Sequence, residues 1–244
     1  MRNLARSGGA ASFFLLISVF GLGLLAVMFA GRTVARTDFV WQKQLVGLIF
    51  SLICFLGIIA GLSPSMCSRR THYKRVGEGG FAGDAHGSED EGFVFVGHHP
   101  NCGSFSSHVL SFNGRVFCAG CMGLVVGAVM SLVGCFLYFF VGLCVNGFSM
   151  VFFWLGFFGV SVGLLQYRIS SHSSLVHFVL NVVFVFGSFL LLVAVDSLLV
   201  SLLLDLYLVA LSVYWVLTRI ELSRVEHRKK CLRCGKPCDL SFAS

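Results

Sequence analysis

Four residues of metal-binding types follow one another in a regular order between positions 99 and 121. His99 and Cys102 have two residues between them, and the glycine after Cys102 permits the tight turn of a zinc knuckle in which histidine replaces the first cysteine. Cys118 and Cys121 then form a Cys-x-x-Cys pair, whose thiolates the positive N-terminus of a following helix would stabilise. We predict that these four side chains bind one zinc ion, with iron as the alternative metal.

The interval between the two pairs predicts a β-hairpin. An Asn-Gly pair at positions 113–114 separates the β-favouring segments 108–112 and 115–117, and it suits a type I′ turn because both residues tolerate positive φ. Knuckle, hairpin and a Cys-x-x-Cys on the first turn of a helix is the order of elements in a treble-clef zinc site. His98 is an alternative ligand to His99, or a hydrogen-bond donor beside it. In the competing interpretation, the cysteines are small apolar residues that begin a membrane helix.

A second group of metal-binding residues lies near the C-terminal end. His227, Cys231, Cys234 and Cys238 fall in a basic segment, and its Cys-x-x-Cys-Gly part again resembles a knuckle, so these four residues could close a second zinc site. Two alternatives stay open: a disordered basic tail with chance thiols, and tail thiols that approach the first site. The spacing matches only part of the ferredoxin pattern for an iron–sulfur cluster.

The composition excludes an ordinary water-soluble fold. Of the 244 residues, 57% are hydrophobic and 12% are charged, whereas soluble domains carry about a quarter charged residues. A bilayer core about 30 Å thick needs roughly 20 apolar residues per helix. We therefore expect an all-α polytopic membrane protein with six transmembrane helices and a small treble-clef-like insert on the cytoplasmic side. The expected helices are approximately 12–30, 45–62, 120–145, 150–166, 175–195 and 198–217, with Asp196 and Ser197 in the last turn.

The positions of the Lys and Arg residues predict the orientation, because short basic loops are translocated poorly. With both termini in the cytoplasm, only Arg32, Arg36 and Lys43 of the 18 basic residues fall outside, and the other fifteen fall inside. We expect a multi-pass protein of the plasma membrane. Arg2 and Arg6 before the first apolar run also suit a signal peptide, but the run lacks a clear cleavage site, which favours an uncleaved helix.

This orientation predicts the state of the cysteines and the partners of the basic tail. Seven of the 10 cysteines fall on the cytoplasmic side, where thiols stay reduced, so metal binding is favoured over disulfides. Cys54, Cys135 and Cys144 lie in apolar runs and are expected to be small packing residues. The tail should contact anionic lipid headgroups, and no specific nucleic-acid partner is predicted.

These features divide the chain into five expected parts. Residues 1–64 would form an N-terminal transmembrane hairpin, and residues 65–92, which are rich in Gly and charge, a flexible polar linker. Residues 93–121 hold the metal-binding knuckle and hairpin. Residues 120–220 form a four-helix transmembrane bundle, and residues 221–244 form a basic cytoplasmic tail with cysteines.

Small and ionisable residues inside the expected helices suggest further contacts. Gly123 and Gly127 belong to a stripe of small residues that permits close helix packing, either within the bundle or between two copies of the chain. Asp205 is expected as a lone carboxylate about 10 Å from the outer boundary of the bilayer core. The polar residues His177 and Asn181 lie in the preceding helix, and His177 is too far from Asp205 in depth to form an ion pair with it. A single carboxylate in this position is either structural or part of a proton or ion path.

The segment His98-His-Pro-Asn-Cys102, followed by Gly114-Arg-x-Phe-Cys118-Ala-Gly-Cys121-x-Gly123, resembles an uncharacterised prokaryotic membrane family, domain of unknown function 2085. The resemblance covers about residues 93–195. Many members have Cys-His where this chain has His-His-Pro-x-Cys. The resemblance implies a shared metal site at the head of a membrane helix, and it implies no activity.

Three functions are compatible with these patterns. The first is a non-enzymatic scaffold or partner-binding protein, whose zinc site rigidifies the cytoplasmic insert. The second is a membrane thiol-disulfide oxidoreductase that uses Cys118 and Cys121, and the third is a small transporter centred on Asp205. No Ser-His-Asp order, phosphate loop, paired carboxylates or H-E-x-x-H motif supports a hydrolase or kinase.

Overall fold

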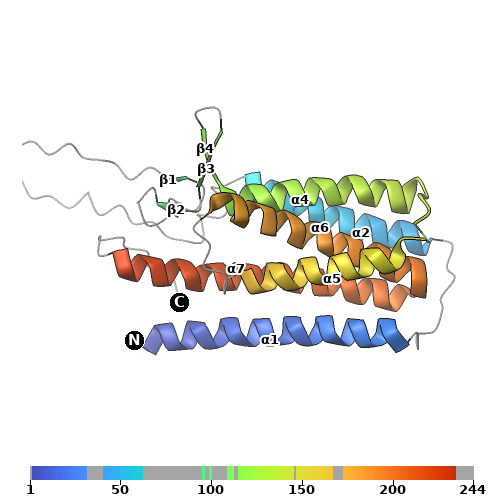
Figure 1. The fold of residues 1–244 in the computed structure, drawn as a ribbon, viewed down its shortest axis with the longest axis horizontal. Helices are drawn as coiled ribbons and strands as arrows, with labels where there is room; N and C mark the ends of the chain where they lie inside the picture. The colour runs from blue at the N-terminus through green and yellow to red at the C-terminus, as the bar shows by residue number, and fades with distance from the viewer. Residues whose placement is uncertain are drawn as a thin grey trace, which may run out of the picture.

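The computed structural model describes residues 2–31, 41–62, 95–96, 99–100, 109–112, 115–145, 147–166 and 173–234. Within them the chain forms six α-helices that run along one another as a bundle (Figure 1). A π-helical segment, η2 (Phe136–Phe140), directly continues α4. The α-helices are α1 (Arg2–Gly31), α2 (Gln42–Leu62), α4 (Ala119–Cys135), α5 (Ser149–Leu165), α6 (Ser174–Leu199) and α7 (Leu202–Cys234).

Two short antiparallel strand pairs precede α4. β1 (Phe95–Val96) pairs with β2 (His99–Pro100), and β3 (Val109–Phe112) pairs with β4 (Arg115–Cys118). The second pair lies where the sequence predicts a hairpin, and its register sets Val109 opposite Cys118. Because α4 begins at the residue after Cys118, β4 leads directly into a membrane helix.

Helix length and hydropathy make this a multi-pass membrane protein. Five segments are long and apolar enough to cross a bilayer, whereas α5, with 17 residues, is shorter. Many large apolar side chains of the bundle are exposed, among them Phe20, Leu52 and Phe158, as lipid contact requires. The five segments are Gly9–Gly31, Gln42–Leu62, Ala119–Phe140, Ser174–Leu199 and Leu202–Glu226.

α6 is the central helix of the bundle. Its membrane segment is 61% buried, whereas that of α2 is 22% buried. α4, α5 and α7 all pack against α6, while α1 packs mainly along α7, and α2 along α4. The side chains that fill this interior are large and apolar, including Phe184, Leu191 and Trp215.

Glycines on α4 and α5 allow both helices to approach the backbone of α6. A methyl group at Gly123 would meet the carbonyl oxygen of Phe178, and one at Gly127 would lie 2.9 Å from the carbonyl oxygen of Val182. These contacts match the packing alternative predicted for the small-residue stripe. A second copy of the chain cannot use Gly123 and Gly127, because α6 covers them.

The third expected helix, 120–145, is shorter than the sequence predicts. The helical segment ends at Phe140, because Gly142 adopts a φ of +84° that turns the chain away from the helix axis. Cys144 therefore lies outside the helix and is exposed, so its interpretation as a packing residue is wrong. The same interpretation is confirmed for Cys54 and Cys135, which are both buried.

The last two helices also differ from expectation. Asp196 and Ser197 lie within α6 and not in a turn, since α6 continues to Leu199 and α7 begins at Leu202. Asp and Ser are common in turns, but here their side chains have partners inside the bundle that keep them helical. α7 extends to Cys234, so the first part of the expected tail is helical.

We expect Gly156→Ala to destabilise the protein by about 1–3 kcal/mol, because the added methyl group would lie 2.6 Å from the carbonyl oxygen of Gly187 and push α5 from α6. Gly57→Ala is the matched control. Nothing lies within 4 Å of its added methyl group, and alanine favours a helix over glycine by about 1 kcal/mol. Thermal unfolding of the purified variants measures the difference, and equal effects of the two substitutions would contradict this packing.

Candidate functional site

The predicted cysteine pair lies where β4 meets α4. Cys118 is the last residue of β4 and is buried, while Cys121 is partly exposed on the first turn of α4. A hydrogen bond from the Cys121 thiol lowers the pKa of Cys118 to about 7, helped by the backbone amides of Cys121 and Gly120 and opposed by burial. The pair therefore offers a thiolate near neutral pH, which is the form that binds metal ions and attacks disulfides.

The other predicted ligands of the first site are only partly described. His99 begins β2, which pairs with β1, and β1 in turn contacts β4, the strand that ends at Cys118. Cys102 and His98 lie outside the described residues. Among the residues that the structure does describe, no three His, Cys, Asp or Glu residues form a group that could hold a metal ion. The structure thus brings together Cys118 and Cys121, and the complete zinc site stays a prediction.

The second predicted group falls mostly on a helix. His227, Cys231 and Cys234 belong to α7, whereas Cys238 lies outside the described residues. α7 includes Cys231 and ends at Cys234, and the glycine that completes the predicted knuckle lies outside the described residues. Spacings of four and three residues place these three positions on one helical face.

A polar cluster ties α5, α6 and α7 together at the same end of the bundle as the cysteine pair. Arg219 of α7 donates to Gln166 Oε1 at 2.6 Å and to Asn181 Oδ1 at 3.0 Å, and Gln166 Nε2 lies 2.8 Å from His177 Nδ1. The sequence marked His177 and Asn181 as candidates. It missed Gln166, which follows α5, and Arg219, which was counted only as a topology signal.

This cluster lies close to the cysteine pair. A methyl group at Gly120 would be 3.7 Å from Asn181 Nδ2 and 3.9 Å from Cys118 Sγ, so Gly120 lies between the two side chains. The start of α4 therefore packs close to Asn181 of α6, and a ligand held by Cys118 would lie near this helix.

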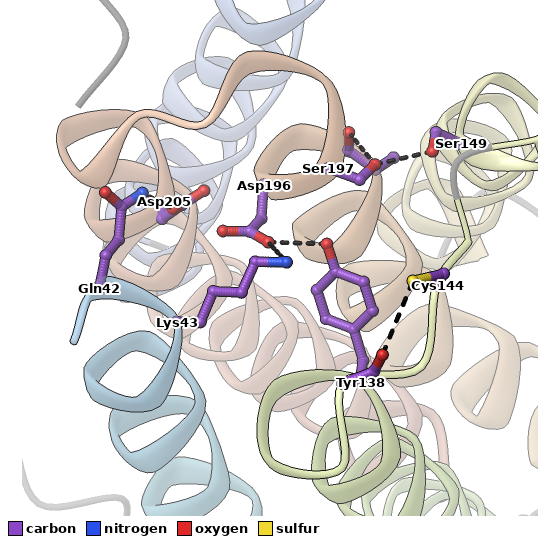
Figure 2. A network of polar contacts seen from close by, with 10 residues as sticks. Gln42, Lys43, Tyr138, Cys144, Ser149, Asp196, Ser197 and Asp205 are labelled. Atoms are coloured by element: carbon purple, nitrogen blue, oxygen red, sulfur yellow. Dashed lines mark hydrogen bonds and ion pairs between the residues drawn. The ribbon is translucent and has the colours of Figure 1, made fainter. Parts of the chain in front are cut away.

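A second polar network occupies the opposite end of the bundle. Figure 2 shows Lys43 and Tyr138 converging on the carboxylate of Asp196. The Tyr138 hydroxyl donates to Asp196 Oδ2 at 2.7 Å, and Lys43 Nζ lies 3.6 Å from the same oxygen and 4.9 Å from the centre of the Tyr138 ring. Beside them, Ser197 donates to Ser149 at 2.7 Å.

Asp205 belongs to this network, so its interpretation as a lone carboxylate is wrong. Gln42 Nε2 donates to Asp205 Oδ2 at 3.0 Å, and the carboxyl group of Asp196 is within hydrogen-bonding reach. The error arose from the position of the last turn, because α7 begins at Leu202 and places Asp205 in its first turn. The sequence signal that could have revealed the network is the polar pair Gln42-Lys43 at the start of the second apolar run.

No family model, curated protein or solved structure matches this chain.

We expect alkylation of Cys118 in metal-free protein to rise with a midpoint near pH 7, since the thiolate that forms above its pKa is the reactive species. Cys121→Ala removes the thiol donor and should move the midpoint toward the ordinary cysteine value of 9.0. Mass spectrometry of the iodoacetamide-treated peptide measures both midpoints. Cys54→Ala, on α2, is the control and should change nothing; an unshifted midpoint in Cys121→Ala would refute the hydrogen bond.

Proposed function

We propose that the chain is a membrane scaffold whose cytoplasmic insert is fastened to the bundle by one zinc ion, bound by His99, Cys102, Cys118 and Cys121. The observation that carries the proposal is the approach of the two cysteine side chains at the junction of β4 and α4. Support for His99 comes from the contact between β1 and β4. The donor chemistry fits zinc, which prefers thiolate and imidazole ligands.

The zinc ion would act as a cross-link and not as a catalyst. Three thiolates and one imidazole fill a tetrahedral shell, so no position remains for a reacting water molecule. The site would carry a net charge of −1, which Arg115 at the start of β4 is placed in sequence to offset. A rigid insert at the head of α4 would then present a surface to a protein partner, and the basic part of α7 would contact anionic lipid headgroups.

A thiol-disulfide oxidoreductase is the second candidate, and the pKa of Cys118 near 7 favours it. In such enzymes the low-pKa thiol must reach a substrate disulfide. Here the low-pKa thiol is the buried one, with 5% of its surface exposed, and Cys121 is the more accessible. This burial supports the structural function over the redox function.

The orientation forms part of the proposal. α1 begins and α7 ends at the bundle end from which the hairpin projects, as six crossings with both termini in the cytoplasm require (Figure 1). α5, at about 26 Å, would be the shortest crossing. Three further points remain predictions. They are the location in the plasma membrane, the resemblance of residues 93–195 to the uncharacterised family, and a second zinc site at His227, Cys231, Cys234 and Cys238.

Purified full-length protein should contain one tightly held zinc per chain, measured by elemental analysis, or more if the second group also binds. Cys118→Ser/Cys121→Ser, Cys102→Ser and His99→Ala should each lose one zinc and lower the thermal unfolding temperature, because structural zinc contributes folding free energy. Cys144→Ser, exposed and at the other end of the bundle, should keep the metal. Full zinc content in the double variant would rule out the site, and disulfide reduction that survives His99→Ala would favour the oxidoreductase.

Reporter fusions test the orientation separately. Fusions after Lys74, Asn146 and Ser244 should report inside, outside and inside, because fifteen of the 18 basic residues then face the cytoplasm. An alkaline phosphatase fusion reports the outside, and a fluorescent-protein fusion reports the inside. An external Lys74 fusion would contradict the topology and the reduced state of the thiols.

A further inference from the structure

Two carboxyl groups meet inside the bundle at the end opposite the cysteine pair. Asp196 of α6 and Asp205 of α7 have no exposed surface, and their carboxyl groups are within hydrogen-bonding reach of each other. One oxygen of each has a donor: Tyr138 and Lys43 contact Asp196 Oδ2, and Gln42 contacts Asp205 Oδ2. The other oxygens, Asp196 Oδ1 and Asp205 Oδ1, are fully buried and have no donor among the described residues.

Two buried carboxylates cannot face each other stably without a cation or a proton between them. Ionised carboxylates only accept hydrogen bonds, so each leaves the other unsatisfied and also repels its charge. A proton on either group turns one oxygen into a donor and supplies the missing O–H···O bond. We propose that Asp196 and Asp205 form a binding site for one exchangeable proton, independent of the zinc site.

The charges that face the pair agree with a single proton. From α2 come the neutral amide of Gln42 and the cation of Lys43, and from η2 the hydroxyl of Tyr138. One ionised carboxylate and one protonated carboxyl group beside Lys43 give a neutral cluster. Two ionised carboxylates would leave an uncompensated negative charge among the membrane helices, which is strongly disfavoured.

A proton fits the site better than a metal ion does. Metal cations that prefer oxygen, such as calcium and magnesium, need about six ligands, whereas the described residues offer two free carboxylate oxygens. The Lys43 ammonium group, 3.6 Å from Asp196 Oδ2, would also repel a metal cation. The Lys43 side chain is 51% exposed while Asp196 is wholly buried, so Lys43 connects the buried site to the surface of the protein.

The turn between α6 and α7 holds the two carboxyl groups together. Val200 has a φ of 47°, a left-handed conformation that a β-branched residue rarely adopts. It lets the chain reverse direction within the two residues that separate the end of α6 from the start of α7. Asp196 therefore lies about one turn before the end of α6, and Asp205 about one turn after the start of α7. Strain of this kind is maintained where the surrounding structure requires a particular geometry.

Infrared difference spectroscopy of full-length protein in lipid vesicles tests the site. A step from neutral to alkaline pH should remove a protonated-carboxyl band, and aspartate labelled with carbon-13 at the carboxyl group should shift that band. Asp196→Asn and Asp205→Asn should each lose the band, while the amide keeps a donor between the side chains. Glu221→Gln, which removes a surface carboxylate paired with Arg224, is the matched control and should keep it.

Lys43→Met provides a second measurement. Without the cation the pair should hold its proton to higher pH, so the loss of the band should move upward by about one pH unit or more. If the wild-type protein shows no protonated-carboxyl band that shifts with the carbon-13 label at neutral pH, the proposal is overturned, whether or not the variants fold. A band that disappears when sodium chloride replaces choline chloride at constant pH would also overturn it, because the site would then bind a metal cation. Neither result depends on zinc content, so the two proposals fail separately.

Discussion

The bilayer core offers no water to polar groups, so polar side chains in the bundle must find hydrogen-bond partners within the protein, on their own helix or on another one. Among the described residues, two groups of such contacts between helices lie at the ends of the bundle. At one end, α5, α6 and α7 are joined by the side chains of Arg219, Gln166, His177 and Asn181. At the other end, α6, α7, η2 and the start of α2 are joined by contacts of Asp196 and Asp205 with Tyr138 and Gln42. Between the two ends, single hydrogen bonds such as Ser51 to Cys135 and Trp215 to the carbonyl oxygen of Ser18 add to the apolar contacts, so polar contacts along the whole bundle restrict how the helices slide along one another.

One continuous helical segment reaches both polar ends. α4 begins at the cysteine pair, close to Asn181, and passes along α6 through its glycine contacts. Its continuation, η2, carries Tyr138 to Asp196. A π-helix adds a residue to a turn, and both Tyr138 and its neighbour Phe139 are buried here, with their rings packed edge to face at 4.8 Å. In a regular α-helix, neighbouring side chains point about 100° apart, so the wider turn helps both to face the interior.

The sequence was most informative where hydropathy determines structure. The apolar runs predicted the helices, and Asn-Gly at 113–114 predicted the strand pair that leads to Cys118. It was misleading wherever a tertiary contact overrode local preference. Asp196 and Ser197 favour a turn by residue type but bond to Tyr138 and Ser149 within the bundle, and the apolar run to residue 145 concealed the glycine that ends the helix. No local pattern could have shown that Arg219 reaches Gln166, because that contact depends on how three helices pack.

Lys43 is one of three basic residues that conflict with the proposed orientation, and the structure supplies a physical reason for its position. The positive-inside rule, by which Lys and Arg residues stay on the cytoplasmic side, reflects the difficulty of translocating free basic residues. Lys43 is not free in the folded protein, since it lies 3.6 Å from Asp196 Oδ2 and over the ring of Tyr138. In the proposed orientation, a cation neutralised by a buried carboxylate would stabilise the folded bundle on the outer side, which would compensate for the unfavourable crossing. The residue that weakens the topology argument is therefore the same residue that the carboxyl pair needs for electrical neutrality.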